Sequence, residues 1–202
     1  DMFDGLYAVV MSGSLIGIFL QVVPITFLVG LVYAIYRLVK IRKRELSVSW
    51  GAEIMRWLFV CYLTGLINLV LVPRNFWTYI WFYLYNGHSG GELDPLFSGN
   101  FNLVPTFLKA QTGEFTIGRW VRTMLEGNLI IFLPMGFFLP FVSKTINTRN
   151  IFAFAVITPI AIELLQPVIG RSFDVDDVMM NFAGIIIGYF ITLGIKATAA
   201  KR

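Results

Sequence analysis

The chain has 202 residues, of which 57% are hydrophobic and 14% are charged, and its mean hydropathy is +0.74. A soluble domain averages roughly 25% charged residues, so this composition excludes a soluble globular protein. It predicts an integral membrane protein with room for about five or six spans of ~20 residues. The formal charge of +4 does not indicate nucleic acid as a partner, because the basic residues lie at the ends of apolar runs.

Five apolar stretches predict transmembrane helices, at about 12–38, 52–72, 121–142, 151–169 and 175–195. A segment that crosses lipid must satisfy its own backbone, as a helix or as part of a closed barrel. The alternation of apolar and polar residues that a barrel requires is absent. The predicted fold class is therefore all-α, a polytopic membrane helical bundle.

Most of the 16 Lys and Arg residues lie in the connections after the first and third stretches and in the C-terminal tail. Cytoplasmic loops carry such an excess, so an odd number of spans predicts an outside N-terminus and a cytoplasmic C-terminus. The turn at 170–177 and the long segment 73–120 then lie on the outer face. Residues 76–85 are mostly aromatic and predict either an anchor belt at the lipid headgroups or a lipid-binding platform.

The chain holds one cysteine and one histidine. Cys61 lies inside an apolar stretch, so we expect neither a disulfide framework nor a thiol metal site, and we expect no metal and no cofactor. His88 and Ser89 adjoin in a glycine-rich segment, whereas catalytic triads are assembled from separate segments, so we expect an ordinary loop there. Asp1 is not expected to be the native start, and the first apolar stretch is too long for a cleavable signal peptide.

A cluster of ionisable and amide side chains interrupts the apolar sequence at 163–181. Each such group at a helix centre costs ~2.5 kcal/mol or more, which makes it a functional candidate. Asp174, Asp177 and Asn181 fall within about 60° on a helix that turns roughly 100° per residue. Asp176 projects away from that stripe and suits the charge preferred at a helix N-terminus.

The same stripe continues as Gly184 and Gly188, a Gly-x-x-x-Gly pair that lets another helix approach closely. Glu163 and Gln166 share a face of the preceding span, and Asn128 lies inside the outer boundary of the span at 121–142. These groups either satisfy one another, at ~0.6 kcal/mol per interhelical hydrogen bond, or form an outward-facing site for a headgroup, a cation or a proton. Several carboxylates beside a single arginine favour the site.

Four blocks of sequence resemble the VanZ family of bacterial membrane proteins. They read Asn-Leu-Val-Pro-Thr-Phe at 102–107, Gly-Asn-Leu-Ile-Ile-Phe-Leu-Pro-Met-Gly-Phe at 127–137, Ile-Glu-Leu-Leu-Gln at 162–166 and Arg-Ser-Phe-Asp-Val-Asp-Asp-Val-Met-Met-Asn-Phe-Ala-Gly at 171–184. The resemblance covers about residues 55–195. Thr106 departs from the family pattern, in which Phe often follows the proline directly.

The resemblance implies a multi-pass protein of the bacterial plasma membrane and a contribution to resistance against the lipoglycopeptide teicoplanin, without an established reaction. Together with the apolar and charge patterns, it predicts two parts: an N-terminal transmembrane helix and basic cytoplasmic loop at 1–50, and a VanZ-like membrane domain at 51–202 with an aromatic-rich outer loop (73–120). The family's polar positions fall on Asn102, Asn128, Glu163, Gln166, Arg171, Asp174, Asp177 and Asn181.

Three functions are compatible with this cluster, and no catalytic residue can be assigned. The first is a non-catalytic protein that binds membrane lipid, a lipid-linked envelope precursor or a lipoglycopeptide, with a polar mouth and apolar walls. The second is an enzyme acting on a lipid-linked precursor through Glu163, Asp174 and Asp177, as acid, base or cation ligands. The third is a transporter using the same carboxylates, although five spans without an internal repeat count against it.

Overall fold

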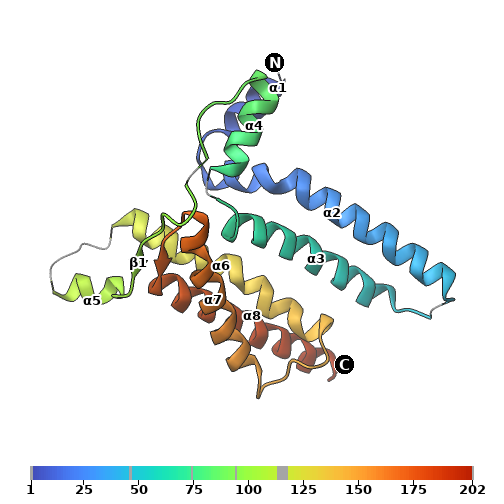
Figure 1. The fold of residues 1–202 in the computed structure, drawn as a ribbon. Helices are drawn as coiled ribbons and strands as arrows, with labels where there is room; N and C mark the ends of the chain where they lie inside the picture. The colour runs from blue at the N-terminus through green and yellow to red at the C-terminus, as the bar shows by residue number, and fades with distance from the viewer. Residues whose placement is uncertain (1, 46, 74, 94, 113–117, 202) are drawn as a thin grey trace. The chain divides into compact units, whose positions relative to one another are not determined.

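The computed structural model describes residues 2–45, 47–73, 75–93, 95–112 and 118–201 (Figure 1). Asp1 and part of the predicted outer segment, at 74, 94 and 113–117, lie outside these ranges. Five helices in the described chain are long and apolar enough to cross a membrane. The predicted all-α bundle with five candidate spans is therefore confirmed, whereas the orientation of the termini stays a prediction.

The chain divides into two compact units. The N-terminal unit comprises Asp1–Ser98 with Val168–Arg171, and the C-terminal unit comprises Gly99–Pro167 with Ser172–Arg202. The domain boundary at residue 50 expected from the sequence stays a prediction.

The N-terminal unit contains α1 (Met2–Val10), α2 (Leu15–Lys43), α3 (Trp50–Val70) and α4 (Phe76–Asn86). The Ser14 hydroxyl caps α2 by accepting a hydrogen bond from the backbone N of Gly17 (3.1 Å). The helix continues through Pro24 and through the basic residues that were predicted to form a loop, ending at Lys43. Cations are favoured in the last turn of a helix, which accounts for the extra length over the predicted 12–38.

Helices α2 and α3 pack closely around Gly30. A Cβ at this position would lie 2.7 Å from the Cys61 Sγ, so only glycine allows this approach without displacing the thiol. The indole Nε1 of Trp57 donates to the Gly30 carbonyl (2.9 Å). Nearer the basic end of the pair, the buried Glu53 on α3 accepts two hydrogen bonds from Arg37 on α2 (2.7 and 2.6 Å).

The aromatic segment 76–85 forms most of α4, which contacts α1 and α2 rather than running as an irregular loop. Tyr85 stacks on Tyr7 of α1 with 3.9 Å between the ring centroids. The hydroxyl of Tyr85 donates to the Asp4 carboxylate, and that bond raises the pKa of Tyr85 above its ordinary value. Trp81 Nε1 donates to the carbonyl of Gln21 on α2 (3.1 Å), so α4 is tied to the first span as well.

The C-terminal unit contains three long helices and a small pair of strands. Its elements are β1 (Phe101–Asn102), α5 (Thr106–Gln111), α6 (Arg119–Val142), α7 (Ile151–Leu165), β2 (Phe173–Asp174) and α8 (Val175–Ala199). A 3₁₀ turn, η1 (Gln166–Ile169), continues α7. Helix α8 packs against both α6 and α7. The short connection between α7 and α8 favours their packing as antiparallel neighbours.

Three glycines bring α6 and α8 into backbone contact. A Cβ on Gly184 would lie 2.4 Å from the Leu129 carbonyl oxygen, and one on Gly188 would lie 2.0 Å from the Leu133 carbonyl oxygen. From the facing side, a Cβ on Gly136 would lie 1.8 Å from the Ile185 carbonyl oxygen. The Gly-x-x-x-Gly stripe predicted on the fifth span is therefore confirmed as the closest part of the interface.

Hydrogen bonds extend the same interface toward the C-terminal end of α8. The hydroxyl of the fully buried Thr192 donates to the Phe137 carbonyl (2.8 Å). Lys196 Nζ donates to the Pro140 carbonyl (2.7 Å), which is one of the last carbonyls of α6 without a partner in its own helix. Pro134 and Pro140 lie within α6, and bonds from a neighbouring helix are one way in which membrane helices tolerate proline.

Candidate functional site

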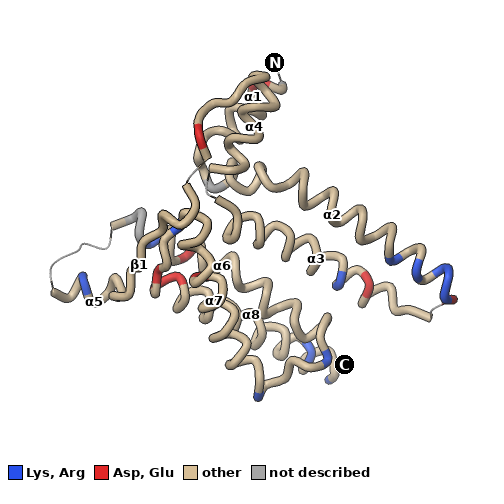
Figure 2. Tube along the Cα trace, viewed as in Figure 1, with Lys and Arg blue, Asp and Glu red and all other residues tan. Residues whose placement is uncertain are grey.

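Acidic residues gather at one end of the C-terminal unit. Figure 2 shows them where α7 joins α8, while basic residues lie both there, as on α5, and at the opposite end, near the C-terminus. The acidic end contains the β1–β2 pair, which is parallel, with Phe101 opposite Phe173 and Asn102 opposite Asp174. Most of the predicted site residues lie at this end.

The strand pair joins the first predicted site residue to the start of α8. Asn102 Nδ2 donates to Asp174 Oδ2 (2.9 Å), and the other oxygen of Asp174 accepts from the backbone N of Asp176 (2.9 Å). Asp174 is thus the N-cap of α8, where it precedes the helix rather than lying within it. Lys109 Nζ donates to Asn102 Oδ1 (2.6 Å), which places a cation one step from this carboxylate.

Glu163 is buried at the C-terminal end of α7, with only 1% of its surface exposed. Its Oε2 accepts from the backbone N of Asp174 (3.1 Å). With its amide oriented to suit both neighbours, Gln166 Nε2 donates to Glu163 Oε2 (3.3 Å) and to the Ser172 carbonyl (3.1 Å). The structure therefore brings Glu163, Gln166 and Asp174 together, as the sequence predicted.

A second contact joins α6 to α8 just above the glycine stripe. Asn128 Nδ2 donates to Asp177 Oδ1. Asn181 lies four residues after Asp177 and therefore on the same face of α8. It is 2% exposed, and its Oδ1 accepts no hydrogen bond from any of the described residues. A buried acceptor without a donor costs about 1–3 kcal/mol, so this position has capacity for an additional donor.

Two contributors to this end of the unit were missed by the sequence reading. Asp176 occupies the first turn of α8 as expected, yet it is buried, and both its oxygens accept from the backbone N of Thr106 (3.2 and 2.9 Å). Lys109 was not singled out at all. It lies on α5 and reaches the cluster through its bond to Asn102, seven residues earlier, and no periodic pattern in the sequence indicates that contact.

Arg171 belongs to the N-terminal unit. There its Nη1 donates to the carbonyl of Leu69 (2.6 Å), in the last turn of α3. It therefore closes the end of a helix in its own unit. The expectation that Arg171 leans over the carboxylates of the cluster stays a prediction.

The described residues include no group of three His, Cys, Asp or Glu side chains arranged to hold a metal ion. The hydrogen bonds of the cluster include carboxylate–amide, carboxylate–backbone and lysine–amide contacts. The carboxylate and amide oxygens of the cluster are groups that accept hydrogen bonds from a ligand's hydroxyl or ammonium groups.

These features define a polytopic helical membrane protein with a buried polar cluster at one end of its spans. A family model described as VanZ/LLP1 matches residues 59–196, more than half of the chain, and the chain belongs to this family. All eight predicted site residues lie within the matched segment. No curated protein and no solved structure matches the chain.

Proposed function

We propose that the polar cluster binds the headgroup of an amphiphilic or lipid-linked molecule at the outer face of the bacterial plasma membrane, and thereby lowers the action of lipoglycopeptides such as teicoplanin. The observation that carries this proposal is the Oδ1 of Asn181. It is a buried acceptor with capacity for a donor, one turn along α8 from the Asn128–Asp177 bond. A hydroxyl or ammonium group of a ligand would supply that donor.

The surroundings of the cluster suit an amphiphile. Phe101, Leu103 and Val104 flank Asn102 and are largely exposed, and Phe107 on α5 is exposed beside them. An acyl chain covering these side chains gains about 25 cal/mol for each Å² of apolar surface removed from water. A polar mouth beside apolar walls is the usual composition of a small-molecule site.

The outward orientation rests on the basic residues at the end of the C-terminal unit that carries no carboxylate of the cluster. The loop between α6 and α7 carries Lys144 and Arg149, and the end of α8 carries Lys196 and Lys201. By the positive-inside rule this end is cytoplasmic, so the acidic end faces outward. A headgroup in the outer leaflet or a lipoglycopeptide in the medium would then reach the cluster without crossing the membrane.

Binding to the purified protein in nanodiscs tests the proposal. Teicoplanin and a lipid-linked cell-wall precursor are titrated separately against the wild-type protein, Asn181→Leu and the matched control Glu126→Gln, which changes an exposed carboxylate on α6. At least one of the two ligands is expected to bind wild type and Glu126→Gln equally, and Asn181→Leu at least about tenfold more weakly, which corresponds to ~1.4 kcal/mol.

The stability of Asn181→Leu separates a binding role from a structural one. Removing a buried acceptor that has no donor should leave the melting temperature unchanged or raise it. If folding needed this acceptor, its removal would lower the melting temperature instead. The proposal fails if neither ligand binds the wild type, or if Asn181→Leu binds as the wild type does. Conversion of the precursor in the same samples would favour the enzyme hypothesis.

A further inference from the structure

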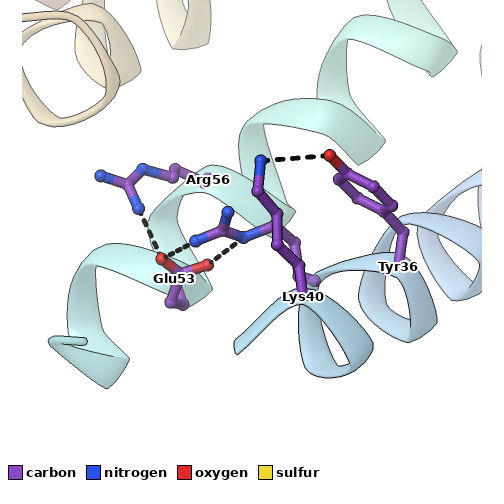
Figure 3. A network of polar contacts seen from close by, with 5 residues as sticks. Tyr36, Lys40, Glu53 and Arg56 are labelled. Atoms are coloured by element: carbon purple, nitrogen blue, oxygen red, sulfur yellow. Dashed lines mark hydrogen bonds and ion pairs between the residues drawn. The ribbon is translucent and has the colours of Figure 1, made fainter. Parts of the chain in front are cut away.

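The basic end of α2 carries charge that the protein does not neutralise. Between residues 37 and 56 the sequence has six basic and two acidic residues. Of the two acidic residues, Glu53 forms ion pairs inside the unit, with Arg37 and with Arg56 (Figure 3). Two arginines on one buried carboxylate leave a net positive charge even at the centre of this network.

The remaining cations line a hollow on one face of α2. The hollow measures about 240 Å³ and is bounded by Tyr36, Val39, Lys40, Lys43 and Arg44. Lys40 Nζ lies 3.2 Å from the Tyr36 hydroxyl and 5.4 Å from the centroid of its ring, as Figure 3 shows for the hydrogen bond. That contact holds the lysine over the hollow. Within the described ranges, Lys43 and Arg44 form no ion pair with a carboxylate.

An exposed apolar stripe leads away from this hollow along the same helix. Leu28 and Val32 precede Tyr36 at intervals of four residues, so the three share a face of α2. Leu28 is 54% exposed and Val32 is 60% exposed. Toward the C-terminus this face is first apolar, at Leu28 and Val32, and then basic, at Lys40, Lys43 and Arg44, with the Tyr36 ring between. The apolar part suits an acyl chain, and the basic part suits a phosphate.

From this arrangement we infer that the hollow binds an anionic phospholipid, with its phosphate between Lys40, Lys43 and Arg44 and one acyl chain along Val32 and Leu28. Cationic side chains attract anionic headgroups near the membrane surface, and the last turn of α2 needs cations in any case. The site is separate from the polar cluster of the C-terminal unit. It also lies outside residues 59–196, the segment that the family model matches.

Lipid adducts of the purified protein test the inference. The full chain is reconstituted with phosphatidylglycerol and phosphatidylcholine in equal parts, extracted gently, and the lipids that remain bound are measured by native mass spectrometry. Wild type is expected to retain phosphatidylglycerol in preference to phosphatidylcholine. The Lys43→Gln/Arg44→Gln double variant should lose that preference by about fivefold or more, since each basic residue near the surface contributes a factor of that order.

Two controls keep the test specific. Lys144→Gln/Arg149→Gln removes two exposed charges from another basic connection and should retain the preference. Lys43→Arg/Arg44→Lys keeps both charges and should retain it as well. Equal loss in the Lys144/Arg149 variant would overturn the inference, because the preference would then follow net charge rather than the hollow. Displacement of bound phosphatidylglycerol by inorganic phosphate alone would also overturn it, because the acyl chain would then contribute nothing.

Discussion

The contact between α6 and α8 predicts a large difference between two glycines of the same helix. At Gly188 a Cβ would lie 2.0 Å from the Leu133 carbonyl oxygen and 2.9 Å from the Phe137 backbone N. Ordinary contact begins at 3.4 Å, so Gly188→Ala requires the two backbones to separate by about 1.4 Å. Overpacking of this kind costs about 1–3 kcal/mol and occasionally more. The atoms in the way here belong to the backbone of α6, so no side-chain rotation can relieve the clash.

Gly194 is the matched control on α8, since a Cβ there would meet nothing within 4 Å. Gly194→Ala should be neutral or stabilise the helix by about 0.5–1 kcal/mol. Thermal unfolding in detergent, followed by circular dichroism, should show Gly188→Ala melting lower by roughly 2–12 °C, at about 2–4 °C for each kcal/mol in a chain of this size. Gly188→Leu should lower the melting temperature further, because its side chain is larger. Equal melting temperatures for Gly188→Ala and Gly194→Ala would refute the packing argument.

Three further outcomes are expected. Thr192→Val removes the donor to the Phe137 carbonyl and should lower the free energy of unfolding by about 0.6 kcal/mol in the same melts; a loss beyond ~2 kcal/mol would contradict this. Glu53→Gln breaks the bonds to two arginines and should cost about 1.5–3 kcal/mol, whereas the exposed Glu126→Gln should stay within ~0.5 kcal/mol. Because its bond to Asp4 raises the pKa of Tyr85 above 10.0, the stability that this bond adds is present below pH 10 and is lost as the pH rises through the raised pKa. Asp4→Ala should therefore ionise one tyrosine at lower pH in an absorbance titration, and superimposable curves would refute the assignment.

The spans could be predicted from the sequence because a helix that crosses lipid must be apolar over about 20 residues, and such runs are visible in the sequence itself. The glycine stripe on α8 was predictable for a related reason, since the spacing of Gly184 and Gly188 fixes a common face. The helices α1 and α4 were not predicted as helices. Their residues are apolar or aromatic without a length that spans a membrane, and only contacts such as the Tyr7–Tyr85 stack show how they pack.

At the candidate site, Glu163, Gln166, Asp177 and Asn181 were found by helical geometry alone. Asn102 came from the family resemblance, and the structure explains its position through the pairing of two strands of two residues each. So short a strand has no periodicity to read. Lys109 and the capping of Thr106 by Asp176 depend on that pairing, which is why the sequence did not indicate them.

Resistance measured beside membrane abundance tests the central claim, that the polar cluster has a function beyond holding the helices together. Asp177→Asn, Asn181→Leu and the control Glu126→Gln are expressed in a susceptible bacterium, and the teicoplanin inhibitory concentration is compared with the amount of protein in the membrane. The account predicts that Asp177→Asn and Asn181→Leu lose resistance while their abundance stays near that of wild type and Glu126→Gln. Resistance that falls only in proportion to abundance would contradict it, because the cluster would then be purely structural.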